Sequence, residues 1–253
     1  MPPQEHVFDL GKFAFELRRR GQHKNVVDAI FSALDAHSAQ ADLQSALDAL
    51  AALKGFAQRD DETFDNHAIA LALLSNAVIL YARATHTQQK ARKTFNIASR
   101  LTPGQKIVHR ELYDLRNDAI AHFGTGKSYS GPNWVRETAL FYIGPHGSKF
   151  GISSRRFTFD RSVVDRINAQ VAVAHGIMTD IRAEKSTFCA TLMNGLLKGN
   201  RAMLELLATF GFDPYDFLGG AVEADAFYKS LQSGHERTFV KGSEQYGDWL
   251  PQR

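Results

Sequence analysis

Apolar side chains recur at three- and four-residue intervals along most of the chain, which is the spacing of an amphipathic helix. Two early stretches have this pattern, residues 26–34 and 43–53, and they predict two helices joined by a linker at residues 37–41. Residues 63–86 are apolar almost all round, which predicts a buried central helix. These elements indicate an up-and-down helical bundle.

The clearest helix start lies at residues 102–105, with the sequence TPGQ. Thr102 can cap free backbone amides, Pro103 suits the first helical position, and Gln105 lies three residues after the cap, as a capping box requires. Gly124 and Gly126 predict the end of this helix.

Residues 134–159 depart from helical spacing. Two runs rich in β-branched and aromatic residues flank a turn signal, GPHG at residues 144–147, and predict a β-hairpin. Helical spacing then resumes and predicts a long helix over residues 160–198 and a shorter one from Asn200 to Phe210. The fold class expected is mainly α, a bundle with an inserted β-hairpin and a long C-terminal helix.

We expect one helical domain over residues 1–212, followed by a glycine-containing tail at residues 213–253 with few periodic apolar positions. The single cysteine, Cys189, excludes an intramolecular disulfide framework and a zinc ligand pair, and its apolar surroundings predict packing in a helix. Glu5 and Asp9 stand where a signal peptide would be basic, so a cytoplasmic location is expected.

A membrane partner is not expected either. Residues 68–84 form the most apolar stretch, but Ser75 and Asn76 interrupt it and Arg83 lies near its end. A membrane-spanning helix needs about 20 mostly apolar residues. We therefore interpret this stretch as a core helix.

Charge is distributed unevenly along the chain although the net charge is only +3. Residues 28–65 contain eight acidic and two basic side chains, and residues 83–116 contain eight basic and two acidic ones. Two interpretations stay open at this point: helices of opposite charge that pair with each other, or a surface that binds phosphates.

Residues 83–116 are called the basic block below. This block leads into the sequence RNDAIAHFG, which begins at Arg116 and includes Asn117, Asp118 and His122. On a helix, Arg116 and His122 point about 120° apart and are separated by a rise of about 9 Å, so both can border one cleft. Asp118 and His122 are four residues apart and can touch, and the carboxylate would raise the pKa of the imidazole toward neutrality.

These residue types suit phosphodiester cleavage without a metal or another cofactor. A histidine of near-neutral pKa can take the proton of a ribose 2′-hydroxyl or give one to the leaving oxygen. Arg116 can stabilise the negative charge that gathers on phosphate, and Asn117 supplies amide donors. Arg110 and Lys127 would add positive charge to a phosphate cleft. With one such histidine per chain, a separate acid and base need a second copy or another residue.

At these residues the chain resembles the HEPN superfamily, the higher eukaryote and prokaryote nucleotide-binding domains, including members from phage abortive-infection and toxin systems. The resemblance rests on a helical bundle over residues 25–125 and on Arg116, five intervening residues and His122. It implies a metal-independent endoribonuclease acting on RNA as a homodimer, with an antitoxin-like protein as a further partner. By the same resemblance, Arg116 contacts phosphate, His122 is the acid–base residue, and Asn117 positions or polarises.

Simpler interpretations stay open for the same residues. His122 could be paired with Asp118 near a helix C-terminus, where the dipole favours a cation, and Arg116 could pair with Glu111 or Asp114. At the level of function, the alternative is a noncatalytic helical dimer that binds nucleic acid or a partner protein through the same cleft.

Other candidate sites are weaker. The phosphate-loop pattern at residues 124–128 is incomplete and follows a helix instead of a strand. His86 and His109 lie on different predicted elements, so no metal site is expected. Arginines at 155–166, interleaved with two phenylalanines, fit a solvated face better than a surface for single-stranded nucleic acid.

Overall fold

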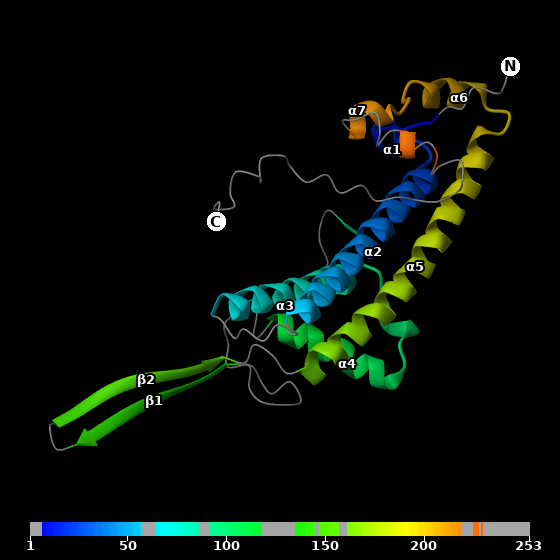
Figure 1. The fold of residues 1–253 in the computed structure, drawn as a ribbon. Coiled ribbons are helices and arrows are strands. Elements are labelled where there is room, and N and C mark those ends of the chain that lie inside the picture. The colour runs from blue at the N-terminus through cyan, green and yellow to red at the C-terminus, as the bar shows by residue number, and fades with distance from the viewer. Residues whose placement is uncertain are drawn as a thin grey trace. The chain divides into compact units, whose positions relative to one another are not determined.

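The computed structural model describes residues 7–56, 64–86, 92–117, 135–144, 147–156, 161–218, 225–227 and 229 (Figure 1). The chain divides into two compact units. The larger unit spans His23–Gly195, and the smaller one combines Met1–Gln22 with Leu196–Arg253.

The described part of the chain is mainly α-helical, as predicted. Its helices and strands are α1 (Leu10–Arg19), α2 (Lys24–Phe56), α3 (Phe64–Thr85), the 3-10 turn η1 (Ala98–Arg100), α4 (Pro103–Asp114), β1 (Val135–Gly144), β2 (Gly147–Arg156), α5 (Arg161–Leu197), α6 (Arg201–Ala208) and α7 (Pro214–Leu218). The inserted hairpin and the long helix α5 are therefore both confirmed.

The predicted break between two early helices is wrong, because α2 is one continuous helix of 33 residues. Residues 37–41, expected to be a linker, have the sequence HSAQA and contain neither glycine nor proline to end a helix. Ala36 and Ala39 in this region are buried in the core, so tertiary packing also favours helix there.

The start of α4 is the capping box that the sequence predicts. The backbone N–H of Gln105 donates to the Thr102 hydroxyl over 3.3 Å, and the N–H of Thr102 donates to Gln105 Oε1 over 2.9 Å. Pro103 occupies the first turn. After Asp114 the helix widens into a π-helical turn at residues 115–117, and the expected stop at Gly124 and Gly126 lies outside the described residues.

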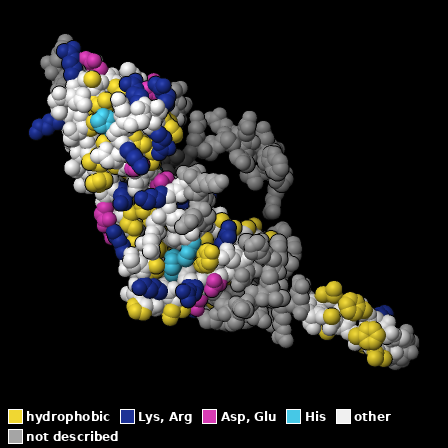
Figure 2. All heavy atoms as spheres, turned by 180° about the vertical axis from the view of Figure 1, so that it is seen from behind, with side chains coloured by type: hydrophobic (Ala, Val, Ile, Leu, Met, Phe, Trp, Pro, Cys, Tyr) yellow, Lys and Arg dark blue, Asp and Glu magenta, His cyan; other side chains and the backbone are white. Residues whose placement is uncertain are grey.

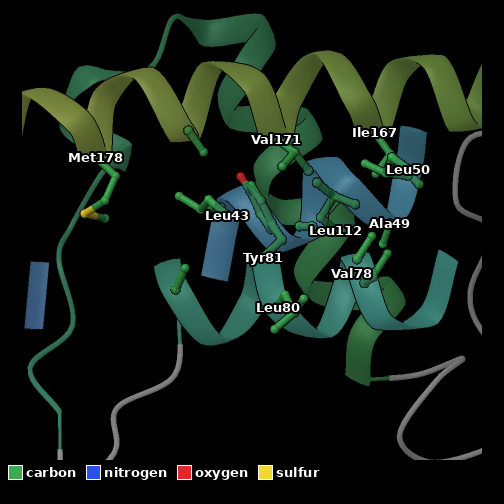
Figure 3. Close-up of a cluster of buried hydrophobic side chains, with 14 of the residues drawn as sticks. Leu43, Ala49, Leu50, Val78, Leu80, Tyr81, Leu112, Ile167, Val171 and Met178 are labelled. Atoms are coloured by element: carbon green, nitrogen blue, oxygen red, sulfur yellow. The ribbon is translucent and has the colours of Figure 1, made fainter. Parts of the chain in front are cut away.

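Helices α2, α3, α4 and α5 share one apolar core. Figure 3 shows side chains from all four helices converging around Tyr81, whose ring is fully buried. The fully or almost fully buried members of this core include Leu43, Leu50, Val78, Leu112, Ile167, Val171 and Met178. A 12-residue helix such as α4 is marginal by itself, so this burial stabilises it in place.

Polar contacts fix the directions of the helices. The end of α3 returns to the middle of α2, where Arg83 pairs with Asp42, so the two helices are antiparallel. Along α5, Thr179 accepts a hydrogen bond from Gln40 over 2.9 Å, and Asp165 pairs with Lys54 at 2.9 Å. Residue numbers rise on α2 as they fall on α5, so these helices are antiparallel as well.

Within the described residues, one helix is long and apolar enough to cross a membrane by length and composition, at Ala68–Thr85 in α3. Half of this window is buried inside the protein. Ala77, Val78 and Tyr81 in it belong to the shared core, which agrees with the interpretation of a core helix. Ile69 and Ile79 lie on its exposed side.

The hairpin pairs β1 with β2 in antiparallel register, with Phe141 opposite Phe150 and Ala139 opposite Ile152. Because side chains alternate between the two faces of a strand, these four residues lie on one face together with Ile143. Both phenylalanines are about two-thirds exposed, at 66% and 69%. The predicted turn residues at 145–146 lie outside the described residues.

The smaller unit joins the two ends of the chain. Phe8 and Gly211 form an antiparallel bridge, and the ring of Phe13 on α1 contacts that of Phe210 edge-on at 6.1 Å. The predicted helix after Asn200 is confirmed as α6, with the Asn200 side chain as its cap. The region expected to be a tail begins with α7.

Replacing Leu112 by alanine should lower the free energy of unfolding by about 3 kcal/mol, because it removes a fully buried side chain from the junction of four helices. Urea denaturation measures the change. Ile107 is the matched control on the same helix, since it is 60% exposed. Ile107→Ala should cost less than about 0.5 kcal/mol, and equal losses in the two variants would contradict this packing.

Candidate functional site

One face of α4 lines a pocket of about 500 Å³. Lys106, His109, Arg110 and Tyr113 contribute to its wall and recur at three- and four-residue spacing, so they share one side of the helix. His86, directly after α3, also lines the pocket. Figure 2 shows histidine side chains gathered in a patch on this view of the surface, with lysine and arginine side chains beside it.

Three aromatic rings stack along the pocket wall. The rings of His86 and His109 are 4.0 Å apart at their centres and almost parallel, with an interplanar angle of 21°. The ring of Tyr113 lies 4.6 Å from that of His86. Tyr113 is 41% exposed while His109 is buried, so the stack leads from the core to the surface.

A buried hydrogen-bond network holds the inner end of this stack. Gln170 on α5 donates from Nε2 to the Tyr81 hydroxyl over 3.1 Å, and that hydroxyl lies 2.6 Å from His109 Nδ1. Because the Gln170 nitrogen can only donate, the Tyr81 proton is free to go to His109. We infer that Nδ1 of His109 accepts this proton and that the imidazole is neutral.

The surroundings of the two histidines favour their neutral forms. Burial, together with the neighbouring His86, lowers the pKa of His109 to about 4. Burial also lowers the pKa of His86, against weaker opposing effects of a hydrogen bond with the His109 backbone and of the Asp114 carboxylate. Nε2 of His86 is a buried nitrogen without a hydrogen-bond partner. At neutral pH the stack is therefore an uncharged aromatic surface.

Ion pairs divide the basic block into two groups. On one side, Asp42 accepts hydrogen bonds from Arg83 and Arg92, and Arg100 pairs with Glu184 at 2.9 Å. These arginines follow the simpler interpretation, in which oppositely charged helices pair. Lys106 and Arg110 are exposed beside the pocket, and within the described ranges neither forms an ion pair.

The first two motif residues, Arg116 and Asn117, lie in the π-helical turn after α4. Arg116 Nη1 donates to Asn117 Oδ1 over 2.7 Å, and both side chains are partly buried. Glu111, considered as a partner of Arg116, pairs with Arg166 of α5 instead. Single π-helical turns inside α-helices are frequent at functional sites.

The other predicted site residues, Asp118, His122 and Lys127, lie outside the described residues. The structure thus brings Arg110, Arg116 and Asn117 together on one helix and its continuation. Arg116 follows Tyr113 by three residues, so it lies about 5 Å further along the helix axis.

The contact between His86 and His109 is absent from the sequence-based predictions, which assigned them to separate elements. A partial signal exists, because His109 precedes the buried Leu112 by three residues and so shares its face. Among the described residues, no group of three or more His, Cys, Asp or Glu side chains could hold a metal ion. Cys189 is buried in α5, as predicted, and burial raises the pKa of its thiol.

Comparisons with protein-family models, with curated proteins and with solved structures found no match to this chain. The described residues of α4, of the turn after it and at the end of α3 combine an uncharged aromatic stack, two cations without an ion pair, and a hydrogen-bonded arginine. This set can bind a ligand that carries both flat rings and negative charge.

Tyr81→Phe should lower the free energy of unfolding by about 1–3 kcal/mol, because it leaves His109 Nδ1 and Gln170 Nε2 buried without their shared partner. Thermal and urea unfolding measure the loss. Tyr113→Phe removes the hydroxyl of a residue in the same stack that is 41% exposed, and it should leave stability almost unchanged. Similar effects of the two substitutions would argue against the network.

The protein should lose stability as the pH falls from about 6.5, the ordinary pKa of histidine, toward the pKa of about 4 held by His109. In this window the unfolded chain binds more protons than the folded one, so stability rises with pH. Between pH 7 and pH 5, His109 should contribute a fall of about 3 °C in Tm.

His109→Asn keeps an acceptor near Nδ1 but cannot titrate, so the fall in Tm between pH 7 and pH 5 should become smaller. The exposed His23 gives the control variant His23→Asn, which should retain the full pH dependence. Differential scanning calorimetry at both pH values makes the comparison. An unchanged pH dependence in His109→Asn would show that this imidazole is not held neutral.

Proposed function

We propose that the chain is an HEPN-like, metal-independent endoribonuclease that cleaves RNA phosphodiester bonds at a cleft between two copies of itself. The observation that carries this proposal is the pair of Arg116 and Asn117, hydrogen-bonded at 2.7 Å in a π-helical turn directly after the cationic face of α4. The sequence then runs on through the five-residue spacing to His122.

Arg116 is the phosphate contact in this mechanism. Its guanidinium is permanently charged and offers several donors in one plane, which suits the oxygens of a phosphate that gains negative charge during cleavage. Asn117 Oδ1 accepts one of these donors. That bond orients the guanidinium and leaves the Asn117 amide nitrogen to donate to the substrate, which is the positioning role implied by the HEPN resemblance.

His122 is the acid–base residue. One imidazole takes the proton of the ribose 2′-hydroxyl while that oxygen attacks phosphorus, and a second imidazole gives a proton to the departing 5′-oxygen. The products are a cyclic phosphate and a free 5′-hydroxyl, so no metal or oxidant enters the balance. Because each chain has one such histidine, His122 of a second copy supplies the other group, which is why we propose a homodimer.

A cytoplasmic enzyme that cuts RNA without a cofactor is active wherever RNA is present, so its activity has to be restrained. This property fits the toxin and abortive-infection members of the HEPN superfamily, and an antitoxin-like protein is the partner that we propose for this role. Phage defence is the corresponding biological setting.

The second candidate function is a noncatalytic RNA-binding dimer. It is favoured by one observation: Lys106 and Arg110 border the pocket without an ion pair among the described residues, and their charges can hold RNA whether or not His122 does chemistry. The two functions differ in cleavage alone, so one assay separates them.

Purified protein incubated with single-stranded RNA in EDTA should release fragments ending in a cyclic phosphate. His122→Ala and Arg116→Ala should each slow cleavage by about 100-fold or more, because they remove the acid–base group and the phosphate contact. Arg116→Lys should recover only part of the loss, since an ammonium lacks the planar fork of donors. Gel electrophoresis of labelled RNA gives the rates.

Arg100→Ala is the matched control, because Arg100 belongs to the same basic block but pairs with Glu184 on the surface. It should cleave at the wild-type rate. Cleavage that survives both motif substitutions, or RNA binding without any cleavage, would refute the enzyme and leave the noncatalytic dimer.

A further inference from the structure

We infer that the pocket beside α4 is a subsite for one nucleotide of single-stranded RNA, with the base stacked on Tyr113 and the adjacent phosphate held by Lys106 and Arg110. The inference rests on the proposed RNA substrate, and it adds a binding site that does not include the predicted catalytic residues. Three features of the pocket support it.

The first feature is the aromatic wall. Tyr113 is 41% exposed, and its ring is backed by His86 at 4.6 Å, which is backed in turn by His109 at 4.0 Å. A ring supported from behind keeps its orientation, so a base can stack on it with little loss of side-chain entropy. Stacking of a base on an aromatic side chain contributes about 1–3 kcal/mol and tolerates every base.

The second feature is charge on the same helix face. Lys106 and Arg110 are four residues apart, so they lie on the same face of α4, and both line the pocket. The ammonium group of Lys106 and the guanidinium group of Arg110 can therefore reach a ligand in the pocket. The acidic groups nearest in sequence are Glu111, which pairs with Arg166, and Asp114. Among the described residues, Asp114 is then the one carboxylate of the two without an ion pair, and two cations against one such carboxylate favour an anion such as phosphate.

The third feature is the fit of size and donors. A volume of about 500 Å³ is within the range of ordinary ligand pockets and exceeds what a lone phosphate needs. Asn96 also lines the pocket, and its Oδ1 accepts the backbone N–H of Ala98 over 3.0 Å. The amide nitrogen of Asn96 is then the group left to donate to an acceptor on the base.

The position of the pocket connects it to the motif. Arg116 follows Tyr113 by about 5 Å along the helix axis. We therefore place the base on Tyr113 in a nucleotide next to the phosphate that Arg116 contacts in the proposed mechanism. The pocket would hold the strand in register for cleavage, so its residues are positioning and binding residues.

The test measures binding in the His122→Ala background, so that RNA is not consumed. Fluorescence anisotropy follows a labelled ten-nucleotide single-stranded RNA. Tyr113→Leu should weaken binding by about tenfold through lost stacking, whereas Tyr113→Phe, which keeps the ring, should bind within about twofold of the parent. Thermal unfolding checks that each variant is folded.

Lys106→Ala combined with Arg110→Ala should weaken binding and reduce the slope of log affinity against log salt by about 1.4, as expected for two lost phosphate contacts on a single strand. Lys24→Ala combined with Lys185→Ala removes the same charge from other parts of the larger unit. This control should change both the affinity at moderate salt and the slope much less than the Lys106 and Arg110 double variant does.

Adenosine monophosphate should compete with the labelled RNA better than inorganic phosphate does, because only the nucleotide brings a base to Tyr113. Equal competition by the two, equal affinities for Tyr113→Leu and Tyr113→Phe, or an absence of RNA binding would each overturn the subsite. RNA that binds through Tyr113 but is not cut by the wild-type protein would refute the proposed enzyme and leave the subsite standing.

Discussion

The buried hydrogen bond between the Tyr81 hydroxyl and His109 is the constraint on which the rest of the site depends. It joins α3 to α4, and Gln170 extends it to α5 over 3.1 Å. An unpaired polar atom inside an apolar core costs free energy, so the arrangement of these three helices that completes the network is favoured. Helix α4 has only 12 residues, so these contacts fix its rotation about its own axis. That rotation sets the direction in which its pocket-lining face points.

Ion pairs take up part of the basic block at residues 83–116 and leave Lys106 and Arg110 at its end. Asp42 takes up two of its arginines, and Arg92 also donates to the backbone oxygen of Arg83 over 2.6 Å. The acidic and basic blocks therefore do pair, at the contact between α2, the end of α3 and the segment after it. Lys106 and Arg110 form no ion pair with any residue that the structure describes. The pairing interpretation is confirmed for the arginines at 83, 92 and 100, whereas the phosphate-binding interpretation stays a prediction for Lys106 and Arg110.

Local signals in the sequence predict much of the fold and little of the site. The capping box at Thr102 and Gln105 acts within four residues, and strand pairing such as Phe141 with Phe150 follows from alternation around one turn, so both could be predicted. The false break in α2 arose where the apolar stripe weakens, although no helix breaker is present. His86 and His109 are 23 positions apart in the sequence, and their contact depends on how α3 and α4 pack. The spacing of residues along one helix cannot predict such a contact.

The neutrality of the two histidines decides what the pocket can select. Two imidazoles with ring centres 4.0 Å apart would repel each other if both were charged, and burial already opposes the charged form. An uncharged stack interacts with a ring through its face, whereas Lys106 and Arg110 interact with an anion through charge. A ligand that satisfies both needs a flat ring and a negative group a short distance apart, and a nucleotide has this construction. The same neutrality makes His86 and His109 poor proton donors at neutral pH, so the acid–base chemistry that we propose falls to His122 and the binding to the α4 face.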